Sequence, residues 1–176
     1  MPAGPASRSE SLVVLGVDPG LTVTGWGVVA AADGEFRSIA SGAIAPRPSR
    51  PVEERLHEIF RGLCDVIERW RPAEVAVEEP FVAENARSAL AIGSARAAAL
   101  LAAAEAGLAV HPYAPAEVKL AVTGHGRSDK AQVQELVRLQ LGLEQAPDST
   151  DEADALAVAL CCHLRRRAET RLEQVR

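Results

Sequence analysis

The chain has 176 residues, three cysteines and a formal net charge of -5 at pH 7, with a sequence pI of about 5.4. This length suits one domain, which can bury about 70% of its unfolded surface and needs no disulfides to hold a core. Cys64, Cys161 and Cys162 show neither CxxC nor Cys/His ligand spacing, which argues against a disulfide framework and against a zinc site. We therefore expect reduced thiols in a cytoplasmic protein.

Neither a membrane span nor a signal peptide is expected. The longest uninterrupted apolar run, 97–104, is far shorter than the roughly 18 residues of a membrane helix, and the N-terminus lacks the apolar core of a signal peptide. The acidic balance argues against an ordinary basic nucleic-acid binder. An enzyme that gathers carboxylates to hold cations can nevertheless be acidic overall and present a local basic rim, because screening makes nearby charges matter most.

One domain is expected over 12–168, after a disordered leader over 1–11 and before a C-terminal tail over 169–176. The domain opens with the apolar run LVVLGV, which starts at Leu12 and is ended by Asp18-Pro19-Gly20. A continuous apolar run stopped by a turn predicts a central strand that is covered on both faces. Asp18 is therefore predicted to lie at the end of a buried strand.

The later elements follow from apolar spacing and turn residues. Strands over 25–31 and 36–44 flank Asp33-Gly34, a dipeptide that favours a type I′ hairpin, so the first three strands are predicted to be antiparallel. Further on, the pattern predicts a helix over 52–70, a strand over 75–77, an alanine-rich helix over 85–106 ended by Gly107, a strand over 108–111, a helix over 116–122, a helix carrying Val133 and Leu141, and a last helix that begins at a Ser149–Glu152 capping box. The order indicates an α/β domain with a mixed five-stranded sheet flanked by helices.

Four carboxylates stand where such a fold can bring them together. Asp18 ends the first strand, Glu78 ends the fourth, and two aspartates three residues apart share a face of the last helix, Asp151 and Asp154. Each has an alternative interpretation. Asp18 suits an Asp-Pro-Gly turn, Glu78 suits a solvated strand end, and Asp151 suits the first turn of a helix. Asp154 is harder to explain structurally, because like charges this close on a helix repel unless a cation offsets them.

Phosphodiester hydrolysis gives a chemical reason for such a cluster. Two metal ions about 3.5 to 4 Å apart can stabilise the attacking and leaving oxygens and lower the pKa of a bound water. Mg²⁺ is a hard cation that prefers oxygen ligands, whereas His and Cys would indicate zinc. The sequence therefore predicts a metal-dependent nuclease, and the bound cations would offset the acidic composition.

These residues and several short motifs together resemble the RuvC family of Holliday-junction resolvases. The resemblance covers about 12–165 and rests on the following motifs: Val17-Asp18-Pro19-Gly20, Thr24-Gly25, Val77-Glu78, Asn85–Leu90, Val118-Lys119, Asp129-Lys130 and Asp151–Leu156. It implies an RNase H-like fold, a homodimer, and Mg²⁺- or Mn²⁺-dependent cutting of two opposed strands at a four-way DNA junction, with two ions per active site. It also implies that a branch-migration helicase is a partner.

The resemblance assigns the four carboxylates to catalysis and metal binding. It selects Glu78 over its neighbour Glu79, because successive strand residues point to opposite faces. Some family members carry histidine in the region of Asp154, so the fourth ligand is the position at which this sequence departs from part of the family.

The resemblance also implies contacts with DNA. Lys119 and Lys130 match basic positions near the scissile phosphate, and Phe81 matches an aromatic residue that contacts unstacked bases, although a core phenylalanine fits Phe81 nearly as well. Lys130 falls in the first turn of a helix expected to be capped by Ser128, where a cation is unfavourable, so another interaction should keep it there. Arg87 and Arg127 are weaker DNA-binding candidates that also fit ordinary surface charges.

A dimer suits the expected task, because a junction has approximate two-fold symmetry and a C2 dimer holds two identical sites at a fixed separation. The small-residue helix over 86–106 is the candidate interface, with burial against the sheet of its own chain as the alternative. Two other classes stay open. An ATP-binding sugar-kinase or actin-like module would need a second domain for which the chain lacks the length, and a non-catalytic DNA-structure binder would not require all four carboxylates.

Overall fold

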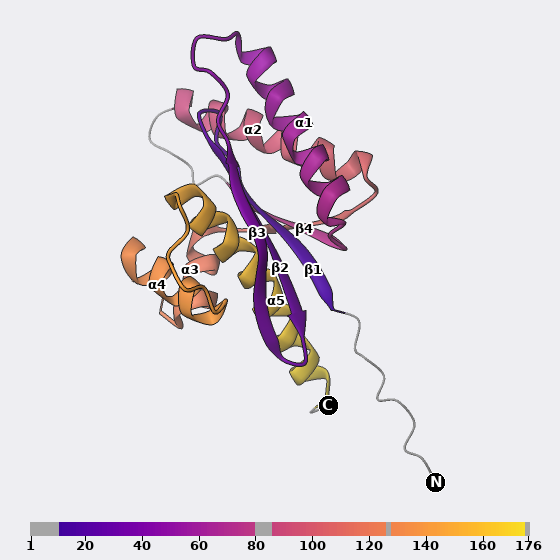
Figure 1. The fold of residues 1–176 in the computed structure, drawn as a ribbon, viewed down its shortest axis with the longest axis vertical. Coiled ribbons are helices and arrows are strands. Elements are labelled where there is room, and N and C mark those ends of the chain that lie inside the picture. The colour runs from indigo at the N-terminus through magenta and orange to yellow at the C-terminus, as the bar shows by residue number, and fades with distance from the viewer. Residues whose placement is uncertain (1–10, 80–85, 126–127, 175–176) are drawn as a thin grey trace.

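The computed structural model describes residues 11–79, 86–125 and 128–174. Five strands and five helices follow one another in these ranges: β1 Leu12–Asp18, β2 Thr24–Ala32, β3 Glu35–Ile44, α1 Val52–Trp70, β4 Glu74–Glu78, α2 Ala86–Glu105, β5 Ala109–Tyr113, α3 Pro115–Thr123, α4 Lys130–Gln140 and α5 Thr150–Gln174. They form one sheet in the order β3-β2-β1-β4-β5, with β1 to β3 antiparallel and β1, β4 and β5 parallel (Figure 1). The predicted mixed sheet is confirmed.

The β2–β3 connection is the two-residue hairpin that the sequence predicts. Asp33 and Gly34 both have positive φ, 54° and 85°, as a type I′ turn requires at its two central positions. Ala32 pairs with Glu35 directly beside the turn. This pairing fixes the register of the antiparallel half of the sheet.

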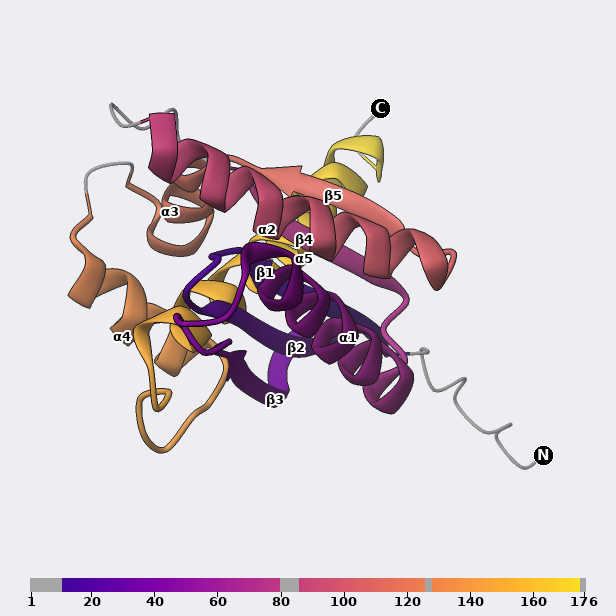
Figure 2. The same cartoon turned by 90° about the horizontal axis from the view of Figure 1, so that it is seen from above.

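Helices cover both faces of the sheet, and Figure 2 shows α1 and α2 together on one side. Alternate residues of β1 serve the two cores: Leu15 and Val17 pack with α1 and α2, whereas Val14 packs with α3, α4 and α5. By the same alternation, Asp18 belongs to the face that α5 covers.

The helix α5 lies unusually close to the sheet because three glycines face it. A Cβ atom built on Gly16 would lie 2.1 Å from the carbonyl oxygen of Ala155, and one built on Gly25 would lie 2.0 Å from the carbonyl oxygen of Asp151. At Gly27 it would lie 2.7 Å from a methyl carbon of Leu156. Strands β1 and β2 therefore accept the α5 backbone directly, and the first turn of the helix is brought beside the end of β1.

Alanine dominates α2, whose buried residues are Ala95, Ala98, Ala99, Ala102 and Ala103. These alanines belong to the core that α1 and the sheet share, so this half of the helix is buried within its own chain. Gly107, with φ +68°, follows the helix as expected. Within the described ranges α2 is the one helix long and apolar enough to cross a membrane, a test that core helices also pass.

The ends of α4 and α5 differ from the sequence-based expectations. Asp129, not Ser128, is the N-cap of α4, and its carboxylate accepts a hydrogen bond of 2.8 Å from the backbone N–H of Gln132. Both residues can cap a helix, and the turn places Asp129 next to the first helical residue. Helix α5 continues to Gln174, across the expected boundary at residue 168.

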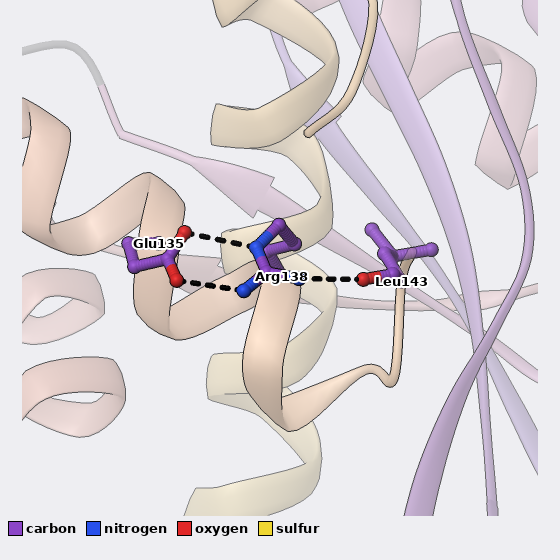
Figure 3. A network of polar contacts seen from close by, with 3 residues as sticks. All are labelled: Glu135, Arg138 and Leu143. Carbon is purple, nitrogen blue, oxygen red and sulfur yellow. Dashed lines mark hydrogen bonds and ion pairs between the residues drawn. The ribbon is translucent and has the colours of Figure 1, made fainter. Parts of the chain in front are cut away.

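A network of polar contacts fixes the far end of α4, as Figure 3 shows. The guanidinium of Arg138 donates to both carboxylate oxygens of Glu135, over 2.7 and 2.9 Å, and to the carbonyl oxygen of Leu143 over 2.9 Å. Gln140 donates to the carbonyl of Val122 in α3 over 2.8 Å. These contacts connect α4 to α3 and to the turn that follows α4.

Because α5 packs so closely on β1, we predict that a side chain at Gly16 destabilises the fold. Gly16→Ala should lower the free energy of unfolding by about 1 to 3 kcal/mol, because the added methyl meets backbone atoms of α5 that cannot move aside. Gly62→Ala is the matched control: its methyl meets the flexible end of Ile44, and alanine favours the helix by about 1 kcal/mol. Urea unfolding measures both variants, and equal stability losses would contradict this account of the α5 seat.

Candidate active site

Asp18 and Glu78 lie side by side at the ends of two neighbouring parallel strands. Val17 pairs with Val77 across β1 and β4, so the next residue of each strand projects from the same edge of the sheet. Ala76, two residues before Glu78, packs in the core beneath α5, which places Glu78 on the same face as Asp18. The two side chains share a hydrogen bond. Because carboxylates only accept, one of the two must carry a proton to make it.

The loop after β1 is held in place by a buried threonine. Thr24 is fully buried, and its hydroxyl donates to the carbonyl of Gly20 over 2.8 Å. Arg55 of α1 donates to the carbonyl of Leu21 in the same loop over 2.7 Å. These two bonds fix the chain that follows Asp18.

The first turn of α5 supplies the other two carboxylates. Ser149 accepts a hydrogen bond of 3.2 Å from the backbone N–H of Glu152, as the predicted cap requires. The carboxylate of Glu152 reaches Ser149 over 3.4 Å and accepts from Ser41 of β3 over 3.0 Å, so it ties the helix start to the edge of the sheet. Asp151 and Asp154 are half-buried and close enough to Asp18 to raise its pKa.

Burial and neighbouring charges make the ionised forms of Asp18 and Glu78 unfavourable. Burial, followed by the nearby charge of Asp154, raises the pKa of Asp18 to about 6. Burial, followed by the charge of Asp18, raises the pKa of Glu78 to about 8. Folding therefore holds acidic groups together although their charges repel one another, and strongly shifted groups of this kind are typical of functional sites.

Two lysines border the carboxylates. Lys130 Nζ lies 2.7 Å from Asp154 Oδ2, and this hydrogen bond is the main reason that the pKa of Lys130 is raised. Lys119 lines a cavity of about 210 Å³ together with Glu78, Lys130 and Asp154. The ion pair is partly exposed, with 57% and 27% of the two side chains accessible, so it contributes little to stability. The cavity thus presents both signs of charge to a ligand.

The structure places Glu79 away from this cluster, as the alternation of β4 predicts. Its carboxylate lies 4.0 Å from the guanidinium of Arg96 in α2, on the opposite face of the sheet from α5. Arg87 is exposed in the first turn of α2. Phe81 and Arg127 lie outside the described residues.

A divalent cation fits the donor set of this site. Across the described ranges, no three Asp, Glu, His or Cys side chains already form a ligand group, and Asp154 is paired with Lys130. Burial and mutual repulsion nevertheless raise the pKa values of Asp18 and Glu78, and a hard cation bound between their half-buried carboxyl groups would relieve that repulsion. Asp18 and Glu78 would hold the metal, with Asp151 and Asp154 beside them.

The mixed sheet, with carboxylates at the ends of β1 and β4 and on α5, defines a nuclease of the RNase H-like class. The family described as "Crossover junction endodeoxyribonuclease RuvC" matches residues 14–163. A Dehalococcoides mccartyi protein of that name is 51% identical over 87% of this chain and 93% of its own length. One from Chloroflexus aurantiacus is 50% identical over 84% of this chain and 90% of its own.

Solved structures agree with the sequence comparison. The structure "T. thermophilus RuvC in complex with Holliday junction substrate" superposes with a TM-score of 0.85 at 41% identity, covering 90% of this chain and 97% of that one. A second Thermus thermophilus RuvC structure has a TM-score of 0.82 at 40% identity, covering 90% and 98%. The chain belongs to the RuvC family of crossover junction endodeoxyribonucleases.

The raised pKa values predict how stability depends on pH when no divalent cation is present. Both folded-state values lie above those of the unfolded chain, so this contribution to stability is present at low pH and is lost as the pH rises toward about 8. Urea unfolding in chelator from about pH 5 to about pH 8 should show a smaller loss for the Asp18→Asn, Glu78→Gln variant than for the parent. Identical pH profiles would show that these carboxyls are not strained.

Proposed function

We propose that this enzyme resolves four-way DNA junctions by hydrolysing one phosphodiester bond in each of two opposed strands, with Asp18, Glu78, Asp151 and Asp154 as the catalytic group. The observation that carries the proposal is the Asp18–Glu78 pair, half-buried and hydrogen-bonded at the end of two parallel strands with the start of α5 against it. The Thermus thermophilus structure described as a junction complex supports the choice of substrate.

We infer that the four carboxylates hold Mg²⁺ or Mn²⁺, two ions per site. Ions bound there would activate the attacking water and stabilise the leaving oxygen. The protein's own part is to fix the ligands. Adjacent parallel strands set the separation of Asp18 and Glu78. The close packing of α5 on the glycines of β1 and β2 sets the position of Asp151 relative to Asp18. Rigid elements, rather than loops, thus carry all four ligands.

The basic residues orient the DNA in this proposal. Lys119 and Lys130 line the same cavity as Glu78 and Asp154, where they would contact phosphate oxygens next to the bond that is cut. Lys130 would then exchange its ion pair with Asp154 for a phosphate contact as Asp154 turns to a metal ion. Arg87 at the start of α2 would contact the backbone further away, and Phe81 and Arg127 stay predictions from family resemblance.

Two copies of the site are needed for paired cuts, and α2 offers a surface for a second copy. Leu90 and Leu101 are 72% and 62% exposed, and they lie eleven residues apart, which is three helical turns along one face. Between them a Cβ atom on Gly93 would meet nothing within 4 Å. We define Leu90, Gly93, Ala97 and Leu101 as the α2 stripe, and infer that it packs against its equivalent in a homodimer.

Two further expectations stay proposals. A branch-migration helicase is the partner that would deliver junctions, which rests on the family resemblance alone, and the cytoplasm is the proposed location, which rests on cysteines without disulfide spacing. Both suit an enzyme that acts on recombination intermediates.

Removing the charge of Asp18 and Glu78 should separate binding from cutting. The Asp18→Asn, Glu78→Gln variant should bind a synthetic four-way junction at least as tightly as the parent, because repulsion of phosphates falls, while Mg²⁺- or Mn²⁺-dependent cleavage drops by several orders of magnitude, roughly 10³-fold or more. Gel shift and single-turnover cleavage, with a matched linear duplex alongside, measure the two properties.

Glu79→Gln is the matched control, since it removes a neighbouring carboxylate on the other face of the sheet. This variant should cut like the parent. A double variant that cuts as fast as the parent would refute the site. A parent protein that binds junctions but nicks nothing with either metal would instead favour a non-catalytic DNA-structure binder.

The α2 stripe should control the oligomeric state. Leu101→Glu places a charge on the stripe and should convert a dimer to a monomer in sedimentation velocity, because a charge buried at an apolar interface is strongly unfavourable. Leu172→Glu, at a similarly exposed leucine on α5, should leave the dimer intact. A parent chain that is monomeric at micromolar concentration would refute the dimer proposal. A Leu101→Glu variant that is still dimeric would show that the interface does not involve the α2 stripe.

A further inference from the structure

The hydroxyl of Thr123, the last residue of α3, is a meeting point of hydrogen bonds. It lies 2.9 Å from the carbonyl oxygen of Lys119 and 2.7 Å from that of His125, and it donates its single proton to one of them. It also accepts from the backbone N–H of His125 over 3.1 Å and from the hydroxyl of Ser128 over 2.8 Å. Three segments of chain therefore contact one oxygen atom.

The hydrogen bonds of Thr123 connect the helix that carries Lys119 to the turn that precedes Lys130. Lys119 lies one helical turn before Thr123 in α3, and its own carbonyl is one of the groups bonded. Ser128 directly precedes Asp129, the N-cap of α4, and Lys130 is the first residue of that helix. Both lysines line the cavity that also contains Glu78 and Asp154. The hydroxyl thus connects the two elements that bring positive charge to the carboxylates.

Apart from the ion pair between Lys130 and Asp154, the contacts that hold α4 to α3 lie at its far end and in the turn around Thr123. Gln140 ties the far end of α4 to Val122, and Arg138 ties it to Leu143. At the near end, the imidazole Nδ1 of His125 donates to the carbonyl of Thr123 over 2.8 Å, which keeps His125 folded back on α3. Ser128 is the residue that joins this turn to α4, and its shortest hydrogen bond goes to Thr123.

We propose that Thr123 is a positioning residue for the nuclease reaction: its hydroxyl sets the spacing between Lys119 and Lys130 and thereby keeps Lys130 on the carboxylate cluster. The proposal rests on the roles that the proposed function gives to the lysines. Thr123 itself touches none of the four carboxylates in the contacts that the described residues make. Its loss should therefore act on the rate of cutting through Lys130, while the fold and the affinity for junction DNA are kept.

The first experiment compares two substitutions that differ in one hydroxyl. Thr123→Val keeps the branched shape and removes the hydrogen bonds, and Thr123→Ser keeps the hydroxyl and removes a methyl group. In single-turnover cleavage of a synthetic junction with Mg²⁺, Thr123→Val should be about tenfold slower, because small displacements of a positioning group cost rates of this order. Its junction Kd should change by less than about threefold, and Thr123→Ser should stay within about twofold of the parent rate.

Thr170→Val is the matched control. The hydroxyl of Thr170 also donates to the carbonyl four residues earlier, Arg166, over 3.1 Å, but within the described part of the chain it joins no second segment. This variant should cut like the parent. A Thr123→Val protein that cuts at the parental rate overturns the proposal, and so does one whose losses in cutting and in junction binding both follow a loss of folded protein in circular dichroism.

A double-mutant cycle with Lys130→Ala identifies the residue through which Thr123 acts. If the hydroxyl works by placing Lys130, Thr123→Val should slow the Lys130→Ala enzyme by less than about twofold. A full tenfold loss in that background overturns the positioning role and leaves the role of Lys130 intact. If Lys130→Ala itself cuts at the parental rate, the role that the proposed function assigns to Lys130 fails, and the positioning role of Thr123 fails with it.

Discussion

The close packing of α5 on β1 and β2 is the constraint on which the site depends. Gly16, Gly25 and Gly27 leave room for the helix backbone, and the carbonyl of Asp151 lies where a side chain at Gly25 would be. Apolar packing of α5 against the sheet stabilises this arrangement, since nearly every residue from Ala155 to Cys162 is fully buried. The hydrophobic core thus forces carboxylates of a helix against carboxylates of two strand ends, although their charges oppose it.

The charge that results has to be offset, and the molecule shows two ways of doing so. Burial and the repulsion between neighbouring carboxylates raise the pKa values of Asp18 and Glu78, so that one of the two can keep a proton, and Asp154 takes Lys130 as its partner. Divalent cations are a third way, and the one that family membership and the oxygen donors favour. Without metal, the negative charges of this site are only partly neutralised, which lowers the stability of the free protein. The same charges raise the affinity of the site for the ions that the reaction uses.

Much of the fold follows from local patterns in the sequence. The Asp33-Gly34 hairpin and the apolar run of β1 predict the strands, and period-two alternation in β4 separates Glu78 from Glu79. Features that depend on distant contacts do not follow from these patterns. The local pattern predicts Ser128 as the cap of α4, whereas the folded turn selects its neighbour Asp129. Likewise, no local pattern shows that α5 packs directly on Gly16 or that Thr123 connects α3 to α4, because the partners of both residues come from other segments.

Direct observation of bound metal would test the central claim most simply. A crystal of the protein grown with Mn²⁺ and measured near the manganese absorption edge should show two anomalous peaks, about 3.5 to 4 Å apart, between Asp18 and Glu78 on the strands and Asp151 and Asp154 on α5. Lys130 should then have left Asp154. Strong peaks elsewhere, with Asp18 and Glu78 still sharing their hydrogen bond, would contradict the account.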